Sequence, residues 1–218
     1  MFKTILFDLD GTLADTAPDL GGALNRLRAE LGLPSVPLAQ LRPFTSQGVR
    51  GLLGAGLSIT PEHPDYKDLS ARLLDIYAKN ICVETSLFEG MAQLLAEIET
   101  SGRQWGIVTN KRTRYTQALV AALGLEQRAA TVVSGDTTPE SKPSPLPLLY
   151  ACRECNSAPA ETLYIGDDRR DVDAGKAAGM RTVAVTFGYL GDGGPIENWG
   201  ADFIANNAQE LAAYIFEQ

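Results

Sequence analysis

The stretch FDLDGT, residues 7–12, decides the fold and raises the first question about function. It ends a short apolar run with two carboxylates, Asp8 and Asp10, which are followed at once by Gly11 and Thr12. Two negative charges this close repel each other, although a strand that runs into an Asp-Gly turn would be an ordinary explanation. The alternative is a site in which one carboxylate attacks a substrate and the other transfers a proton, with a cation between them.

The composition is that of a globular protein with an acidic balance. At 218 residues the chain has room for one α/β domain and a modest insertion, and an apolar fraction of 44% allows a buried core. The net charge of −8 and the lack of a basic run argue against nucleic acid and anionic membranes as partners. The sequence shows three cysteines, no signal-peptide core and no membrane span. We therefore expect a cytoplasmic protein, either a monomer or a homodimer.

Two residue types narrow the chemistry. The single histidine, His63, lies in a proline-flanked loop, which excludes a Ser-His-Asp triad and a multi-histidine metal site. Cys152 and Cys155 share the spacing of redox and zinc motifs, but they fall within a predicted helix and no second pair exists, so we interpret them as structural. If the protein is a hydrolase, carboxylates or lysine must carry the reaction.

Short apolar runs recur along the chain, as expected for strands that are buried on both faces of a parallel sheet. They are Thr4–Phe7, Trp105–Val108, Thr131–Val133, Thr162–Ile165, Arg181–Val185 and Asp202–Ala205. From residue 90 onward they alternate with helical patterns that stop at glycines such as Gly102 and Gly124. This alternation predicts an α/β fold with a doubly wound parallel sheet.

Residues 15–85 interrupt the alternation. Two stripes of apolar residues at helical spacing begin at Leu20 and Leu69, and no convincing strand lies between them. We therefore expect a small all-helical cap, inserted after the first strand and hinged near residues 14–18 and 82–88. The expected domains are a core of residues 1–14 and 86–218 and a cap of residues 15–85.

Polar residues follow the predicted strands at the edge where open α/β sheets bind ligands. They are Asp8 and Asp10 after the first strand, Thr109 and Asn110 after the second, Lys142 in SKPSP, and Asp167, Asp168 and Asp171 after the strand at 162–165. Taken singly, these residues have ordinary interpretations as helix caps, a surface lysine or a solvated turn. Their position at one shared edge favours a functional site.

Together these residues suit one chemistry. Asp8, Asp10 and Asp167 supply the hard oxygens that Mg²⁺ prefers, and Mg²⁺ would offset their repulsion and attract a phosphate. Thr109 begins a helix N-terminus that can bind a phosphate, and Lys142 adds a positive charge against the phosphoryl oxygens. The sequence predicts phosphoryl chemistry in which one carboxylate attacks phosphorus and the other transfers a proton.

This constellation resembles the haloacid dehalogenase (HAD) superfamily of phosphotransferases over nearly the whole chain. Residues 8–12 match its Asp-x-Asp-Gly-Thr motif, Thr109 matches the second motif and Lys142 the third, and Gly166-Asp167 with Asp171 match the fourth. The resemblance implies a HAD-like, Rossmannoid core with a small helical cap over the site.

The resemblance also implies the role of each motif residue. Asp8 would be the nucleophile that forms an aspartyl-phosphate, and Asp10 the acid/base, which also offers its backbone carbonyl to Mg²⁺. Asp167 would complete the protein ligands of the metal. Asp171 would support these ligands, and so would Asp168, which stands where many members carry serine.

The loop TSQGVRG, residues 45–51, is the segment of the expected cap that we single out as a candidate substrate contact. By resemblance, Ser46, Gln47 and Arg50 would face the leaving group of a phosphate ester, and Asn110 would contact the substrate from the core. For Arg50 a solvated helix position is an equal alternative.

Longer segments resemble one bacterial branch of the superfamily. They include FEGM at 88–91 and GDDRRDVDAG at 166–175, while DTAPDL at 15–20 and the small cap look like phosphoglycolate phosphatase. This branch, often named phosphoglycolate phosphatase, includes N-acetylmuramic acid 6-phosphate phosphatases of cell-wall recycling. The resemblance implies a phosphomonoester hydrolase of a small phosphorylated metabolite, with 2-phosphoglycolate as the main expectation and N-acetylmuramic acid 6-phosphate as the alternative.

Two other functions are less favoured. A β-phosphoglucomutase-like enzyme usually carries a histidine soon after the Asp-Thr pair, here Asp15-Thr16, and this chain has none there. A phospho-receiver module would bind rather than hydrolyse, but receivers are much shorter and their acceptor aspartate ends a mid-chain strand, whereas Asp8 ends the first.

Overall fold

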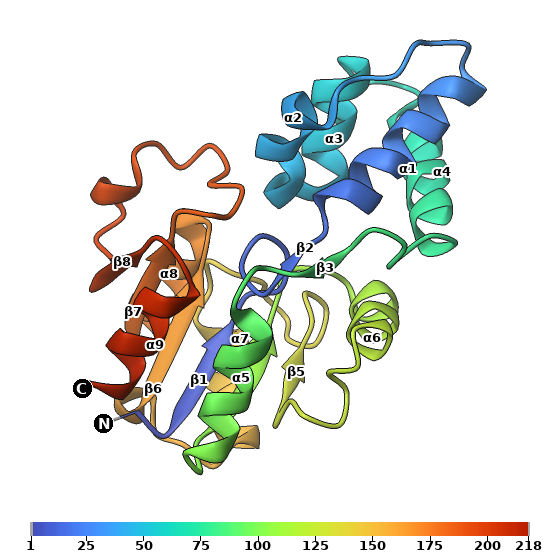
Figure 1. The fold of residues 1–218 in the computed structure, drawn as a ribbon. Helices are drawn as coiled ribbons and strands as arrows, with labels where there is room; N and C mark the ends of the chain where they lie inside the picture. Colours follow the sequence, from blue (N-terminus) through green and yellow to red (C-terminus); the bar gives the residue numbers. More distant parts are fainter. Residues whose placement is uncertain (1, 218) are drawn as a thin grey trace.

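A six-stranded parallel sheet forms the centre of the molecule in a computed structural model that describes residues 2–217 (Figure 1). The strand order is β5-β4-β1-β6-β7-β8, with β1 at Thr4–Phe7, β4 at Gln104–Val108, β5 at Val132–Val133, β6 at Thr162–Gly166, β7 at Arg181–Val185 and β8 at Phe203–Ala205. β1 lies between β4 and β6, and its Phe7 pairs in register with Ile107 and Ile165. The predicted doubly wound parallel sheet is confirmed.

Helices cover both faces of this sheet. One face packs against α5 (Met91–Thr100), α6 (Thr113–Ala122) and α9 (Ala208–Phe216), and the other against α7 (Leu146–Glu154) and α8 (Arg169–Ala177). Side chains of β1 alternate between the two layers, because Ile5 and Phe7 join the first core and Leu6 joins the second. Strands that are buried on both faces read as continuous apolar runs, which explains why the sequence located them.

A separate group of helices follows β1 and is called the cap below. It consists of α1 (Ala17–Glu30), α2 (Leu38–Leu41), the 3₁₀ segment η1 (Arg42–Gln47), α3 (Gly48–Leu57) and α4 (Tyr66–Ala78). These elements bury an apolar cluster that includes Leu24, Leu52 and Leu73, and Tyr115 of α6 is a buried member of it from outside the cap. Figure 1 shows the cap as a group set apart from the sheet and its helices. Within residues 2–217, none of the helices combines the length and the apolar character that a membrane span requires.

Two linkers join the cap to the rest of the chain. They pair as a short antiparallel ribbon of β2 (Ala14–Asp15) and β3 (Ser86–Leu87). Asp19, in the first turn of α1, is buried. Its carboxylate accepts hydrogen bonds of 2.7–3.1 Å from the returning linker, donated by the amides of Val83, Glu84 and Thr85 and by the Thr85 hydroxyl. The sequence does not predict this ribbon, because strands of two residues leave no periodicity.

The remaining predictions from single residue types agree with the structure. His63 lies at the surface of the cap, with its side chain 42% exposed. Cys152 and Cys155 are buried and form no disulfide, and burial raises the pKa of the Cys155 thiol to about 11. Both side chains are packed in the interior as free thiols, which agrees with the structural interpretation of this pair.

Candidate active site

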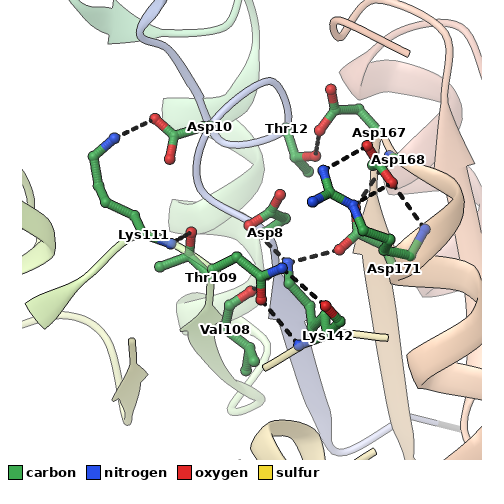
Figure 2. Close-up of polar contacts among 12 residues, drawn as sticks. Asp8, Asp10, Thr12, Val108, Thr109, Lys111, Lys142, Asp167, Asp168 and Asp171 are labelled. Carbon is green, nitrogen blue, oxygen red and sulfur yellow. Dashed lines mark hydrogen bonds and ion pairs between the residues drawn. The ribbon is translucent and has the colours of Figure 1, made fainter. Parts of the chain in front are cut away.

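The carboxyl ends of β1, β4 and β6 meet at one edge of the sheet, and the loops there bring the predicted residues together (Figure 2). Asp8 follows β1, Thr109 follows β4 and Asp167 follows β6. Lys142 reaches the same place from the loop between β5 and α7. The side chains meet because parallel strands place all their carboxyl ends on one side.

Three buried carboxylates form the floor of the site. Asp8, Asp167 and Asp171 each offer an oxygen within 4.8 Å of the other two. Burial raises the pKa of Asp8 to about 7, although the nearby Lys142 ammonium lowers it. Burial, together with the charges of Asp8 and Asp171, raises the pKa of Asp167 well above its usual range.

This cluster fits a hard divalent cation. Three carboxylates buried beside one ammonium carry an excess of negative charge that is costly to desolvate. Carboxylate oxygens are also the ligands that hard cations prefer. A bound cation would lower the raised pKa values and let the carboxylates stay ionised.

Lys142 is the buried cation of the site. Its Nζ lies 2.9 Å from Asp8 Oδ1 and donates hydrogen bonds to Asp171 Oδ1 at 2.6 Å, the Tyr164 hydroxyl at 2.7 Å and the Val108 carbonyl at 3.0 Å. Burial alone would lower the pKa of Lys142, but the carboxylates of Asp171 and Asp8 outweigh it and raise the pKa. Lys142 therefore stays charged and points at the proposed nucleophile.

Asp171 and Asn110 hold this lysine in place. One carboxylate oxygen of Asp171 accepts a hydrogen bond from Lys142, and the other accepts one from the Asp168 amide at 3.1 Å. These contacts are consistent with the supporting role expected for Asp171. Asn110 was expected to contact the substrate. In the structure, the Asn110 side-chain amide binds the backbone of Lys142 instead. It accepts a hydrogen bond from the Lys142 backbone nitrogen and donates one to the Lys142 carbonyl, both at 3.0 Å. Asn110 still lines the cavity above the site.

Asp10 turns away from the acidic cluster, as Figure 2 shows. Its Oδ1 accepts hydrogen bonds from the Thr16 hydroxyl at 2.6 Å and from Lys111 Nζ at 2.7 Å. The turn directly after Asp10 needs Gly11, whose φ is +86° and where a Cβ would collide with the Asp167 carboxylate. The Asp10 side chain is therefore not one of the clustered carboxylates, and it is available for the transfer of a proton.

Lys111 was not predicted as a site residue. It follows Thr109-Asn110 directly, so its position at a strand end was an available signal. The Lys111 side chain is 9% exposed and reaches Asp10 across the site. The Thr109 hydroxyl accepts a hydrogen bond from the Lys111 amide at 3.2 Å, so these neighbours are held as one unit.

Asp168 connects the core to the cap. Its carboxylate caps α8 by accepting the Arg170 amide at 2.9 Å, and it binds the Arg170 guanidinium through two further hydrogen bonds at 2.8 Å. Arg170 in turn donates to the Ser46 carbonyl of the cap at 2.8 Å. An aspartate in place of serine therefore orients an arginine that contacts the cap.

A cavity of about 360 Å³ lies between the acidic cluster and the cap. Ser46 and Gln47 line it, and the Ser46 hydroxyl is 3.4 Å from Asp167 Oδ2. Arg50 is exposed on α3 and is not one of the lining residues. The structure brings Ser46 and Gln47 to the site but leaves Arg50 at the protein surface.

Tyr189 joins a site carboxylate to the start of the cap. Its amide donates to Asp167 Oδ2 at 2.8 Å, and its hydroxyl accepts from the amides of Thr16 and Ala17 at 2.7 and 2.9 Å. The same hydroxyl donates to Asp15 Oδ1 at 2.9 Å. Sequence reasoning missed this residue, because a tyrosine in a loop carries neither a charge pattern nor a periodicity.

Comparison with known proteins assigns this geometry to a family. The family model described as haloacid dehalogenase-like hydrolase matches residues 5–185. The chain belongs to this family. It is 40% identical over 213 residues to N-acetylmuramic acid 6-phosphate phosphatase from Pseudomonas putida, with 98% of this chain and 96% of the relative covered.

Two further members of the haloacid dehalogenase-like family agree with this assignment. Phosphoglycolate phosphatase from Xanthomonas campestris pv. campestris is 40% identical over 216 residues, which cover 96% of this chain and 94% of the relative. The crystal structure of a predicted phosphoglycolate phosphatase from Haemophilus somnus matches with a TM-score of 0.86 and 26% identity over 98% of each chain. The expectation of a phosphatase with a HAD-like fold is confirmed.

Proposed function

We propose that this protein hydrolyses phosphomonoesters with Mg²⁺ and forms a phospho-Asp8 intermediate. The observation that carries the proposal is the position of Asp8. Its carboxylate ends the central strand at the floor of the cavity, 2.9 Å from Lys142 Nζ and within the acidic cluster. Family membership supports the choice of metal, since HAD phosphatases generally use Mg²⁺.

The residues that would hold Mg²⁺ are Asp8, Asp167 and the backbone carbonyl of Asp10. When bound, the ion neutralises the carboxylates and the charge of the transferring phosphoryl group. The Thr12 hydroxyl and the Tyr189 amide orient Asp167 through hydrogen bonds of 3.0 and 2.8 Å.

The reaction would proceed in two transfers. Asp8 attacks phosphorus, and the ester bond breaks as Asp10 gives its proton to the departing oxygen. Asp10 then takes a proton from the water that attacks phospho-Asp8, which releases inorganic phosphate and restores the carboxylate. Thr109 and Lys142 bind the phosphoryl oxygens throughout, and Lys142 provides the fixed positive charge.

The cap would cover this chemistry. We propose residues 15–85 as a cap domain and residues 1–14 and 86–218 as the core domain. The apolar cluster of the cap and the contacts of Ser46 with Asp167 and Arg170 support this division. A cap that closes over a phosphate ester excludes bulk water from the intermediate.

Two substrates are candidates. 2-Phosphoglycolate is the first, because relatives such as the Xanthomonas enzyme carry that name. N-acetylmuramic acid 6-phosphate is the second, supported by the name of the Pseudomonas relative and by the size of the cavity. A volume of about 360 Å³ has room for a sugar phosphate, whereas a two-carbon acid would fill a small part of it.

The test is a comparison of kcat/KM for the two esters with Mg²⁺, using Asp8→Asn as the control. We expect at least one ester to be hydrolysed with kcat/KM of about 10⁴ M⁻¹s⁻¹ or more, and the activity to be lost in Asp8→Asn. Multiple turnover would exclude a receiver module, and release of inorganic phosphate would exclude a mutase. Wild-type turnover by Asp8→Asn would refute the proposed nucleophile.

The cellular setting stays a prediction. A cytoplasmic location and a monomeric or homodimeric state are consistent with the acidic, small-molecule phosphatase proposed here. Size-exclusion chromatography with light scattering would distinguish the two oligomeric states.

A further inference from the structure

Two buried hydroxyl groups of the cap line the cavity, and neither has an acceptor for its proton, although the Lys111 ammonium donates toward the Tyr77 oxygen. Thr45, in η1, is 3% exposed, and Tyr77, in α4, is 1% exposed. Among residues 2–217, the buried hydroxyl groups that donate no hydrogen bond are those of Thr4, Thr45, Ser70 and Tyr77, whereas Asp8 Oδ1 lies 2.9 Å from Lys142 Nζ. Asp8, Thr45 and Tyr77 all belong to the lining of this one cavity.

Such groups point to a ligand-binding role. Leaving a buried hydroxyl without a partner costs about 1–3 kcal/mol, and native proteins rarely tolerate it without a reason. Thr45 and Tyr77 come from different elements of the cap, yet both line the same cavity as Asp8. One ligand that spans the cavity from Asp8 to the cap would satisfy both hydroxyls.

Tyr77 is a hydrogen-bond donor in this setting. Burial raises the pKa of its hydroxyl to about 12, although the Lys111 ammonium lowers it, so the proton stays on the oxygen. Lys111 Nζ lies 5.0 Å from the centre of the Tyr77 ring. An ammonium can donate but cannot accept, so Lys111 offers no acceptor for the Tyr77 proton.

The rest of the lining shows what kind of ligand fits. Its apolar part consists of Leu20, Val49, Leu74 and Tyr115. The cations among the lining residues are largely paired, Lys111 with Asp10, Lys142 with Asp8 and Asp171, and Arg170 with Asp168. Arg112 makes no ion pair in the part of the chain that the structure describes, and it is solvent-exposed at the rim.

We propose that Thr45 and Tyr77 bind the leaving group of the phosphate ester and that this group is polyhydroxylated, as in a sugar phosphate. The inference rests on the proposed phosphatase function. A sugar hydroxyl can accept from Tyr77 and exchange a hydrogen bond with Thr45, and its C–H groups suit the apolar walls. A carboxylate at this depth would lack a free cation, whereas one farther along the leaving group would lie near Arg112.

This subsite favours the second candidate substrate over the two-carbon acid. In 2-phosphoglycolate the carboxylate lies one carbon from the ester oxygen, so it would be buried beside the two hydroxyls and the apolar walls. In a hexose 6-phosphate, the neutral ring carbon C5 with the ring oxygen occupies that place, and the nearest hydroxyl, on C4, lies one bond farther. Tyr77 and Thr45 would then be specificity-determining residues that act on the leaving group and not on the phosphoryl group.

The experiment compares two primary phosphate esters with rings of the same size. N-acetylmuramic acid 6-phosphate is the hydroxylated probe and cyclohexylmethyl phosphate is the hydroxyl-free probe. We measure the ratio of their kcat/KM values for wild type, Tyr77→Phe, Thr45→Val and the double variant. Each single variant should lower the ratio of kcat/KM for the hydroxylated probe to kcat/KM for the hydroxyl-free probe by about 3- to 10-fold. This is the effect expected from the loss of one or two hydrogen bonds to a neutral group.

A matched control comes from the same helix as Tyr77. Ser70 also carries a buried hydroxyl without a partner, but it is not part of the cavity lining, so Ser70→Ala should leave the ratio unchanged. The melting temperatures of Tyr77→Phe and Thr45→Val should equal or exceed that of wild type, because each removes an unsatisfied group. A hydroxyl with a structural role would instead lower the melting temperature when removed.

The outcomes separate this inference from the proposed function. A wild-type enzyme that does not prefer the sugar phosphate, or variants that leave the ratio unchanged, would overturn the subsite. If no ester is hydrolysed, or if Asp8→Asn stays active, the proposed function fails and the subsite fails with it. Loss of the preference in the cap variants, with Asp8→Asn inactive on both probes, would establish both.

Discussion

The carboxylate of Asp10 illustrates how single side chains are fixed in this site. Its Oδ1 accepts hydrogen bonds from Lys111 and Thr16, which belong to different segments of the chain. An acid/base must point at the leaving oxygen in the transition state, and a misplacement of about 1 Å can cost a hundredfold in rate. Lys111 is therefore a positioning residue for the proposed proton transfer.

Replacing Lys111 should affect catalysis more than substrate binding. In Lys111→Gln, we expect kcat to fall about 10- to 100-fold, because Asp10 loses the ion pair that orients it, while KM changes less. Steady-state kinetics on one phosphate ester would measure this. Lys176→Gln is the matched control, because Lys176 is exposed on α8 and donates to the Gly200 carbonyl. A kcat equal to that of the control would contradict the role of Lys111.

The two linkers between cap and core are the elements on which the cavity depends. Asp19 at the start of α1 binds the returning linker at residues 83–85, and Tyr189 binds the amides at the start of the same helix. The position of α1 is thus set from both sides by buried hydrogen bonds. Because α1 carries Leu20 into the cavity lining, these bonds also shape the substrate site.

Asp19→Asn should destabilise the fold. The variant keeps one carbonyl oxygen but turns an NH₂ group toward amide donors, so at least one buried donor loses its acceptor. We expect the free energy of unfolding to fall by about 2–4 kcal/mol, measured by urea denaturation. Glu30→Gln is the control: it breaks the exposed ion pair with Arg72, for which a loss of about 1 kcal/mol or less is expected. Equal losses in the two variants would refute the linker role of Asp19.

Across the whole molecule, a net charge of −8 is combined with a buried acidic cluster. In the metal-free protein, burial raises the pKa of Asp8 to about 7, so the folded state holds this proton more tightly than the unfolded chain does. The contribution of Asp8 to stability is therefore present at low pH and is lost as the pH rises from 3.8 to about 7. A bound cation would offset this loss of stability at higher pH, because it favours the ionised form of Asp8.

Protons and Mg²⁺ should therefore compete for the site. With a pKa of about 7, the Asp8 carboxyl of the metal-free protein would be mostly protonated at pH 6 and mostly ionised at pH 8. We expect the apparent affinity for Mg²⁺ to be weaker at pH 6 than at pH 8 by about tenfold or more, because Asp167, whose pKa is also raised, must lose its proton as well. Isothermal titration calorimetry at the two pH values would measure this. Equal affinities, or tighter binding at pH 6, would show that Asp8 is not a ligand.

The sequence predicts what depends on local pattern. The central strands could be located because burial on both faces leaves continuous apolar runs, and the acidic and basic motif residues could be grouped because they follow strand ends. The directions in which the side chains of Asp8 and Asp10 point could not be predicted. Asp8 and Asp10 are two residues apart, yet Asp8 lies with Asp167 and Asp171 while the Asp10 side chain binds Lys111.

Contacts between distant segments are the second part that the sequence does not show. Tyr189 binds Thr16 across 173 positions, and Arg170 binds Ser46 across 124. Arg50 shows the reverse case, since its charge suggested a substrate contact but the orientation of α3 leaves it at the surface. These outcomes depend on how the cap lies on the core, which no local pattern encodes.

The measurement that tests the central claim most directly is the capture of phospho-Asp8. The enzyme is quenched with acid during turnover of a phosphate ester, and peptide mass spectrometry locates the phosphoryl group. We predict a phosphoryl group on Asp8 in wild type and none in Asp8→Asn, whose kcat should fall about a thousandfold or more. A phosphoryl group on another residue, or wild-type phosphate release by Asp8→Asn, would contradict the proposed mechanism.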